Sequence, residues 1–508
     1  MNPNRLRLIN LVTLSAALAA CNMPTRAARE ATLQAILATM DAVTPMPTGT
    51  LPPTETPGPG AVPTPVRVEQ PFPNFEPSGA TFFYTTRSGD TLPALAGRFG
   101  VEQHQMSADV ALPSSGLLPP GQQVQIPNVL ESISPGGDLL PDGELVYSPT
   151  ASDFDLHGFV ASAGGYLSRH SESLPDGSVL GGAAIVQRVA DENSVNPRLL
   201  LALLEFRSGW VFGSFPNAAS LQYPIGFRIP ERTGLYQDLT VAAVQLNLGY
   251  YGWRAGTMLE TKTGTGGTLR WNPTLNAGSV ALLRLFVLLT ESDEWLNPAA
   301  GFAATYEAMF GDAWARAEAA GPLLPPGLAQ PPLELPFAPR EYWSLTAGPH
   351  NAWSYGTPRA ALDFSPITGG DPCDVSPAWA TASAPGVIVR ATDNAVALDL
   401  DGDGRESTGW VLLYYHLADE GLISPWIQVS TGDPLGHPSC QGGRATGKHV
   451  HLVRKYNGEW IPADGLVPFS LSGWQVVADA RNYYGSLVRG DEVVMSDSSG
   501  QRGSTIWR

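Results

Sequence analysis

Residues 447–453 read GKHVHLV, a stretch that is typical of a β-strand and places two histidines two residues apart. Successive side chains of a strand point to opposite faces of the sheet, so His449 and His451 face the same way. Two imidazoles that converge on one face indicate a zinc centre. Because two ligands do not hold a catalytic metal, the remaining ligands have to come from other segments of the chain.

Length and composition bound the class of protein. The chain has 508 residues with 46 prolines and 54 glycines, which indicates linkers and many turns. A chain of this length suggests about three domains. The formal net charge of −17 and the low isoelectric point near 4.9 argue against nucleic acid as a partner, since nucleic acid is bound by basic patches.

The first 21 residues have the pattern of a secretory signal. Arg5 and Arg7 precede the apolar run LINLVTLSAALAA, which is too short for a confident membrane span. The run ends in LAAC at residues 18–21, which resembles the bacterial lipobox, whose cysteine is lipidated. The position of Cys21 favours this interpretation over an ordinary signal peptide with an incidental cysteine. A lipid on Cys21 would anchor the protein to the bacterial membrane, outside the cytoplasm and facing the cell wall.

A proline- and threonine-rich segment follows the signal and precedes the first folded module. Residues 22–80 are predicted to be a linker, extended where proline dominates. Residues 81–130 contain YTTRSGDTLPALAGRFGV and LPPGQQVQIP, which resemble the two ends of a LysM module. That resemblance implies a small βαβ-type fold that binds N-acetylglucosamine-containing glycans of peptidoglycan or chitin. The loop around Gly89–Leu92 is the expected contact.

Residues 150–335 are predicted to be mostly helical. The segment ADENSVNPRLLLALLEFRSGW resembles a helix of lytic transglycosylases and related lysozyme-like proteins, whose catalytic glutamate precedes Ser-Gly. Arg207 occupies that position here, and Glu205 is turned roughly 200° away on a helix. Arginine cannot protonate a leaving oxygen. The expectation is a degenerate lysozyme-like domain that binds glycan or acts as a spacer; an unrelated helical bundle is the alternative.

The chain becomes rich in strands from about residue 340, and residues 340–480 are predicted to form a mainly antiparallel β domain. Three motifs in it resemble the LytM/lysostaphin-type zinc metallopeptidases. They are AALDFSP around Asp363, YYHL around His416, and the opening GKHVH. That family cuts the peptide cross-links of peptidoglycan. Residues 481–508 are expected to be a C-terminal extension.

The resemblance implies a role for four residues. Asp363 and His451 would ligate zinc, while His416 and His449 would flank the bound water. Zinc lowers the pKa of its water toward about 7 and polarises the scissile carbonyl. Neighbouring histidines orient the nucleophile and stabilise the oxyanion.

The third expected ligand is missing from its position. The family uses His-x-x-x-Asp, and Arg359 stands four residues before Asp363. A guanidinium stays protonated and does not ligate a metal. Either His350 enters the site from a neighbouring strand, which is the favoured interpretation, or Arg359 pairs with Asp363 in an inactive descendant. The second outcome would make the protein a wall-binding protein or an amidase activator rather than an enzyme.

Two further features of this domain carry predictions. Cys373 and Cys440 are expected to form a disulfide, because two cysteines in one extracytoplasmic domain favour a bond. The acidic residues of DLDGDG at 399–404 have the spacing of a calcium loop, but Trp410 stands where a glutamate would complete it. The candidate calcium ligands are Asp399, Asp401 and Asp403. A polar hairpin turn is the simpler interpretation.

The predicted architecture is therefore multidomain. It comprises a LysM βαβ-type module, a helical lysozyme-like domain and a mainly antiparallel β peptidase-like domain. The predicted function is that of a zinc endopeptidase anchored in the envelope, with peptidoglycan as its partner.

Overall fold

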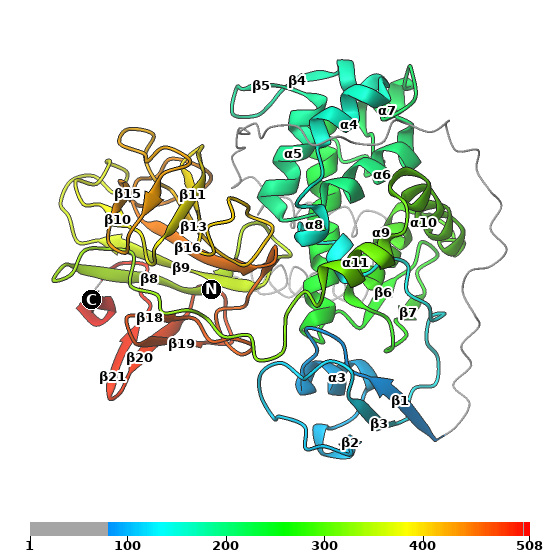
Figure 1. The fold of residues 1–508 in the computed structure, drawn as a ribbon, viewed down its shortest axis with the longest axis horizontal. Coiled ribbons are helices and arrows are strands. Elements are labelled where there is room, and N and C mark those ends of the chain that lie inside the picture. Colours follow the sequence, from blue (N-terminus) through cyan, green and yellow to red (C-terminus); the bar gives the residue numbers. More distant parts are fainter. Residues whose placement is uncertain (1–79, 501) are drawn as a thin grey trace, which may run out of the picture. The chain divides into compact units, whose positions relative to one another are not determined.

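The computed structural model describes residues 80–500 and 502–508 (Figure 1). The predicted signal peptide with Cys21, and the predicted linker up to residue 79, lie outside the described residues. Within the described ranges, no helix is long and apolar enough to cross a membrane.

The N-terminal module is a three-stranded antiparallel sheet with one helix, drawn in blue in Figure 1. Its elements are β1 (Thr81–Thr85), α3 (Leu92–Phe99), the 3₁₀ helix η3 (Gln103–Gln105), β2 (Ser107–Ala108) and β3 (Gln123–Pro127). The side chain of Thr91 accepts a hydrogen bond from the backbone of Ala94 and caps the start of α3, while Gly100 ends the helix in the left-handed conformation. These caps explain why the helix is confined to eight residues.

The next part of the chain is helical, with two short hairpins. Its α-helices are α4 (Leu156–Ala163), α5 (Gly182–Asn193), α6 (Pro197–Ser208), α7 (Ala218–Gln222), α8 (Leu235–Arg254), α9 (Ala277–Leu289), α10 (Leu296–Phe310) and α11 (Ala313–Ala320). Its 3₁₀ helices are η4 (Asp142–Glu144), η5 (Pro149–Ala151) and η6 (Tyr166–Arg169). Its hairpins pair β4 (Ser171–Ser173) with β5 (Val179–Gly181), and β6 (Glu260–Lys262) with β7 (Thr268–Arg270).

Helix α8 is the centre of this helical domain. It is buried along most of its length and packs against α5 and α9. The contact with α9 is close at Gly249, where an added Cβ atom would lie 2.6 Å from the Cα of Ala281. Such a distance requires glycine, because no real Cβ atom approaches another backbone so closely.

The C-terminal domain is built on a large antiparallel sheet with the strand order β14-β11-β12-β13-β16-β9-β8-β22. These strands are β8 (Tyr342–Asn351), β9 (Arg359–Pro366), β11 (Gly386–Thr392), β12 (Ala395–Asp399), β13 (Trp410–Tyr415), β14 (Gln428–Val429), β16 (Val450–Tyr456) and β22 (Thr505–Trp507). Strand β17 (Glu459–Trp460) pairs with β16, and β10 (Ala380–Thr381) pairs with β15 (Pro434–Gly436).

Residues 481–508 belong to this domain rather than extending beyond it. A four-stranded sheet comprises β18 (Ser470–Leu471), β19 (Trp474–Ala478), β20 (Gly485–Arg489) and β21 (Glu492–Met495). The short helix η7 (Arg502–Ser504) then leads into β22, which pairs with the outer side of β8. The domain boundary predicted at residue 480 therefore cuts through this smaller sheet. Such long-range strand pairing leaves no local signal in the sequence.

The two faces of the large sheet are covered by different parts of the chain. One face lies in the core of the C-terminal domain and includes Leu362, Leu412 and Leu452. Alternate residues on the same strands point the other way. Those on the second face join the core of the helical domain; they are Ala361, Ala395, Ala397, Val411, Leu413, Tyr415 and Val453. The helical domain therefore covers this second face.

Candidate metal centre

The register of three strands places the candidate ligands on one face of the large sheet. His451 of β16 lies directly opposite Asp363 of β9, and His350 of β8 lies opposite Ala361. Residues that are directly opposite each other share a face, as do residues two apart on one strand. All three side chains therefore face the same side. The β8–β9 register shifts between Ala347 and His350, and such a bulge re-aims the residue that follows it.

Three donor atoms of these side chains converge. The Nε2 atom of His350 lies 3.0 Å from Nδ1 of His451. The Oδ1 atom of Asp363 lies 3.3 Å from the first of these nitrogens and 3.2 Å from the second. For comparison, the donors of a tetrahedral zinc ion lie roughly 3.3–3.4 Å apart when the bonds are about 2.0–2.1 Å long.

Hydrogen bonds on the far side of each ring determine which nitrogens face the cluster as lone pairs. The Nδ1 atom of His350 lies 2.9 Å from the carbonyl of Gly348, and Nε2 of His451 lies 2.9 Å from the carbonyl of Ala352. A carbonyl only accepts, so these nitrogens carry the protons and their ring partners carry lone pairs. This arrangement of outer hydrogen bonds is the one found behind histidine ligands of metals.

The carboxylate of Asp363 also fits a cation. Its Oδ1 atom is buried and has no hydrogen-bond partner among the described residues. Burial alone would raise the pKa of Asp363, but the positive charge of His350 and His449 in their protonated forms holds it well below its usual range, so the carboxylate favours a cation beside it. When both rings are neutral, two imidazole lone pairs and one carboxylate oxygen form a donor set suited to zinc.

His416 and His449 lie beside this cluster. Their ring centroids are 4.5 Å apart, and Nε2 of His449 lies 3.7 Å from Oδ2 of Asp363. The Nδ1 atoms donate to the carbonyls of Gln441 and Gly447, so both Nε2 atoms are acceptors. Burial, with His449 and His451 adding to it, lowers the pKa of His416 to about 3. The backbone of His416 has a φ of 65°, an uncommon value for a residue with a side chain and one that clusters at functional sites.

Two family models match the first two parts of the chain. Residues 84–127 match the LysM domain, and residues 138–323 match the domain described as "LasA, N-terminal domain". The second match begins before the boundary predicted at residue 150. The lysozyme-like interpretation of the helical domain, which depends on short motifs, stays a prediction.

The chain is also similar to two proteases. Protease LasA of Pseudomonas aeruginosa (strain UCBPP-PA14) is 25% identical over 382 residues, which are 71% of this chain and 81% of that protein. Beta-lytic metalloendopeptidase of Lysobacter enzymogenes is 26% identical over 164 residues, 30% of this chain and 82% of that protein. The chain combines a LysM module with a LytM-type metallopeptidase domain.

A solved structure is also similar to part of this chain. It is described as a novel M23 metalloprotease, pseudoalterin, from the deep sea. The sequence identity is 23%, the TM-score is 0.29, and the similarity covers 35% of this chain and 100% of that chain.

Arg359 of the LytM-type domain points away from the cluster. Its Nε donates to the carbonyl of Pro349, and its Nη2 donates to the carbonyls of Asp479 and Arg481, at 2.6 and 2.9 Å. The ion pair with Asp363 that the inactive alternative requires is not among those formed by the described residues. Arg359 instead fastens β9 to the segment that leads into the small sheet.

Tyr483 is a neighbour of the cluster that the sequence did not reveal. Its ring stacks on His350 with centroids 4.6 Å apart and an interplanar angle of 19°. Burial, with Asp363 nearby, raises the pKa of Tyr483, so its hydroxyl stays protonated. Tyr483 lies in the segment predicted to be an extension, and no motif marks it.

Cys373 and Cys440 of the LytM-type domain are joined by a disulfide, the pair expected from the sequence. The bond connects the loop that follows β9 to the loop that precedes β16. Lys448 reinforces this connection, because its backbone N–H donates to the carbonyl of Pro372 at 2.6 Å. The disulfide thus braces the segment that carries His449.

The acidic loop between β12 and β13 brings the carboxylates of Asp399, Asp401 and Asp403 within 4.8 Å of one another. Burial, with Asp401 beside it, raises the pKa of Asp399 to about 6. The nearest additional acid in the sequence, Glu406, pairs with Arg390 and Lys455 instead. Calcium binding by this loop stays a prediction.

Proposed function

We propose that the protein is an extracytoplasmic zinc endopeptidase that hydrolyses peptide cross-links of peptidoglycan. The observation that carries this proposal is the convergence of His350, Asp363 and His451, with lone pairs aimed at one point and spacings near those of a tetrahedral metal. The LysM module supports peptidoglycan as the substrate, because LysM domains bind its glycan strands. The similarity to a beta-lytic metalloendopeptidase supports the cleavage of a peptide bond within a chain.

The histidines beside the cluster supply the acid and base chemistry. Zinc, when bound to His350, Asp363 and His451, would lower the pKa of a water molecule and polarise the scissile carbonyl. His416 is neutral because burial lowers its pKa to about 3, and its Nε2 atom carries a lone pair that can accept a hydrogen bond from the attacking water. A ring that has accepted a proton becomes a donor toward the oxyanion and the leaving amine. A positive charge on His449 would be stabilised by Asp363, whose Oδ2 lies 3.7 Å from Nε2 of His449.

The helical domain packs against the face of the large sheet that carries the candidate ligands. The hairpin between β8 and β9 contacts it directly, because the hydroxyl of Ser354 donates to Asn193 of α5 at 3.2 Å. An added Cβ atom at Gly356 would lie 2.9 Å from the carbonyl oxygen of Val244 in α8. We infer that an extended peptide substrate requires the helical domain to move away from the sheet face.

Zinc content tests the site. The full chain is expected to bind one equivalent of zinc, measured by elemental analysis, and the His350→Ala variant is expected to lose it. His437→Ala is the matched control, because His437 lies in the same domain but stacks on Trp379 away from the cluster. Wild-type protein that binds no zinc, yet still sediments with purified peptidoglycan, would favour the wall-binding alternative and overturn the enzyme.

The lipid anchor is a separate part of the proposal and is supported by the LAAC motif at residues 18–21. Metabolic labelling with palmitate is expected to mark the protein in bacterial cells that express it. The Cys21→Ser variant is expected to lose the label. Equal labelling of both would refute lipidation at Cys21 without affecting the proposed peptidase.

A further inference from the structure

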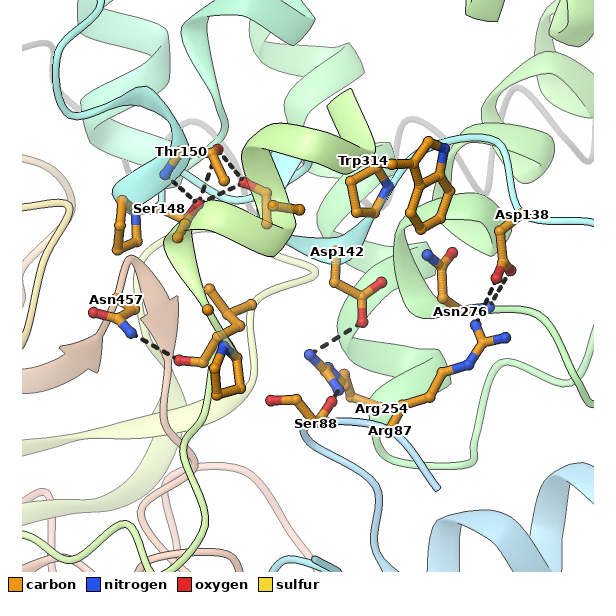
Figure 2. Close-up of a pocket in the computed structure, with 18 residues that line it drawn as sticks. Arg87, Ser88, Asp138, Asp142, Ser148, Thr150, Arg254, Asn276, Trp314 and Asn457 are labelled. Atoms are coloured by element: carbon orange, nitrogen blue, oxygen red, sulfur yellow. Dashed lines mark hydrogen bonds and ion pairs between the residues drawn. The ribbon is translucent and has the colours of Figure 1, made fainter. Parts of the chain in front are cut away.

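A pocket away from the histidine cluster lies where the three folded parts of the chain meet. Its volume is about 370 Å³, at the lower end of the range for small-molecule sites. Arg87 and Ser88 of the LysM module line it, as does Asn457 of the LytM-type domain, while the helical domain supplies the remaining walls (Figure 2). None of the candidate metal ligands borders this pocket.

Two ion pairs form the polar wall of the pocket. Arg87 pairs with Asp138 at 2.8 Å, and Arg254 pairs with Asp142 at 3.2 Å. Each carboxylate also accepts a backbone N–H at 2.8 Å, from Asn276 for Asp138 and from Gly278 for Asp142. A carboxylate offers about four acceptor positions, so both retain capacity for a ligand. Their side chains are 18% and 15% exposed and can therefore be reached.

The charges on this wall exclude most ligand classes. Arg87 is paired with Asp138, and Arg254 is shared between Asp142 and the buried Glu459, so an anion would find no uncompensated positive charge. A cation would have to compete with the guanidinium groups that already hold both carboxylates of the wall. An apolar ligand would displace water from both ion pairs and offer no hydrogen bonds in its place, and this loss of hydration costs free energy. A hydroxyl group both donates and accepts, so it can bond to a carboxylate and a guanidinium at once. The wall therefore fits a neutral molecule with several hydroxyl groups.

The wall is also held rigidly before any ligand arrives. Arg254 is buried, and its Nη2 atom lies 2.9 Å from the hydroxyl of Tyr250. Its Nε atom lies 3.1 Å from the carboxylate of Glu459, and Nη1 donates to the carbonyl of Ser88. One side chain thus connects all three folded parts. A preformed wall reduces the entropy that binding has to overcome.

Trp314 supplies an apolar surface beside these ion pairs. It lies on α11, its side chain is exposed to 47%, and Figure 2 shows its indole above Asp142 and Asn276. Ala317 and Ala320 of the same helix keep the space next to it open. A large exposed aromatic ring packs favourably against an apolar face, while its polar neighbours fix the orientation of the bound molecule. A pyranose ring has such an apolar face and also carries the hydroxyl groups that the ion pairs fit.

We propose that this pocket binds a pyranose unit of a neutral glycan. The proposal does not depend on the peptidase activity, since it shares no residue with the metal centre. It extends the glycan-binding surface beyond the LysM module, whose loop at Arg87 and Ser88 forms one side of the pocket. A bound sugar would contact all three parts of the chain and stabilise their arrangement, because a ligand that binds only the folded assembly favours it.

Calorimetric titration of the full chain with N-acetylglucosamine tetramer tests the proposal, with cellotetraose as a second probe. EDTA is present throughout, so that peptidase activity plays no part. At least one tetrasaccharide is expected to show a binding event that is assigned to the pocket. The affinity of this event is expected to fall at least about tenfold in Trp314→Ala, because an aromatic anchor is lost. Ala317→Trp, which fills the pocket without removing a polar group, is expected to weaken the same binding event.

Trp426→Ala is the control, because Trp426 is 52% exposed but lies in the LytM-type domain outside the pocket. Its affinity is expected to equal that of the wild type, and the melting temperatures of all variants verify folding. Binding that is unchanged in both pocket variants would assign the sugar to the LysM module alone and overturn the proposal. Absence of saturable binding by either probe at millimolar concentration would also overturn it.

Discussion

Two segments of the chain carry an arginine where the family that each segment resembles has a functional residue. The surroundings of these two arginines differ. On α6, Arg207 stands where a lysozyme-like helix would carry its catalytic glutamate; its Nε donates to the carbonyl of Ile225. The nearby carboxylates are engaged, since Glu205 accepts the backbone N–H groups of Val211 and Phe212. Asp238 likewise accepts three backbone N–H groups, including that of Ile225. Both of these carboxylates therefore have structural roles.

On β9, the replaced ligand position has a different outcome. Arg359 turns toward backbone carbonyls, and His350 of the adjacent strand occupies the space beside Asp363. In the proposed metal centre, the bulged strand β8 presents His350 as the substitute ligand. Beside α6, the carboxylates of Glu205 and Asp238 are held by backbone N–H groups instead.

The largest expected effect concerns the substitute ligand. His350→Ala is expected to lower peptidase activity by more than about a hundredfold, which exceeds the loss typical of residues that only support ligands. Adding Arg359→His to this variant is expected to restore nothing, because the side chain at 359 is directed toward Pro349 and Asp479. Release of peptides from purified peptidoglycan, with zinc content measured in parallel, checks both variants. Recovery of zinc binding in the double variant would show that a side chain at position 359 can reach the metal site, as His350 does.

The disulfide holds one side of the same site and is expected to have the next largest effect. Cys373 and Cys440 are separated by 67 residues, and a crosslink of this span stabilises by roughly 2–4 kcal/mol. The Cys373→Ala/Cys440→Ala variant is expected to unfold at correspondingly lower denaturant concentration. Chemical denaturation followed by tryptophan fluorescence measures the change. An unchanged midpoint would show that hydrogen bonds such as that of Lys448 suffice.

A pH effect is expected in the helical domain. Burial raises the pKa of Glu192 to about 7, and its partners are Arg188 and the hydroxyl of Tyr236. A carboxyl whose pKa is raised on folding favours the folded state at low pH and loses that contribution as pH rises through its folded pKa. Stability is therefore expected to fall by roughly 2–3 kcal/mol between pH 5 and 8 on account of this group.

Glu192→Gln is the variant that isolates this effect, because glutamine cannot titrate. The pH dependence of its unfolding free energy is expected to be flatter over the same interval, measured by urea denaturation at several pH values. Glu318→Gln, on the exposed surface of α11, is the matched control. A slope that is identical in Glu192→Gln and the wild type would contradict the assignment.

The smallest expected effect concerns Arg207 of α6. Arg207→Glu restores the residue that the lysozyme-like family requires, yet no glycan hydrolysis is expected. Its surroundings provide a carbonyl and the buried carboxyl of Asp238 rather than a site for a sugar ring. Release of reducing ends from purified glycan strands is the measurement. Any hydrolysis above that of the wild type would mean that α6 retains a competent cleft.

Most residues of the candidate site could be named from short sequence motifs. Asp363, His416, His449 and His451 are named from motifs of the resembling family, and strand periodicity bears only on His449 and His451. The structure places Asp363 and His451 within β9 and β16, and His416 and His449 just outside β13 and β16. His350 could be named but not positioned, because the bulge that aims it arises from the pairing of β8 with β9. A β-bulge depends on partner strands and is not encoded in local composition.

Contacts between residues that are far apart in the sequence could not be predicted from it. Tyr483 reaches His350 only because residues 470–495 fold into a sheet of their own. The pocket beside Trp314 combines residues from 87 to 457, each ordinary by itself. Sequence periodicity reports which face of an element is buried, but not which distant element covers it.

The pairing of β22 with β8 has a consequence for how the chain behaves as it emerges from the ribosome. Until residues 505–507 are available, β8 is an unprotected edge strand, with backbone groups open to another chain. Fragments that stop short of residue 505 therefore expose a ready template for strand-to-strand aggregation. Strand β22 therefore covers the edge of β8, the strand that carries His350, and blocks its pairing with another chain.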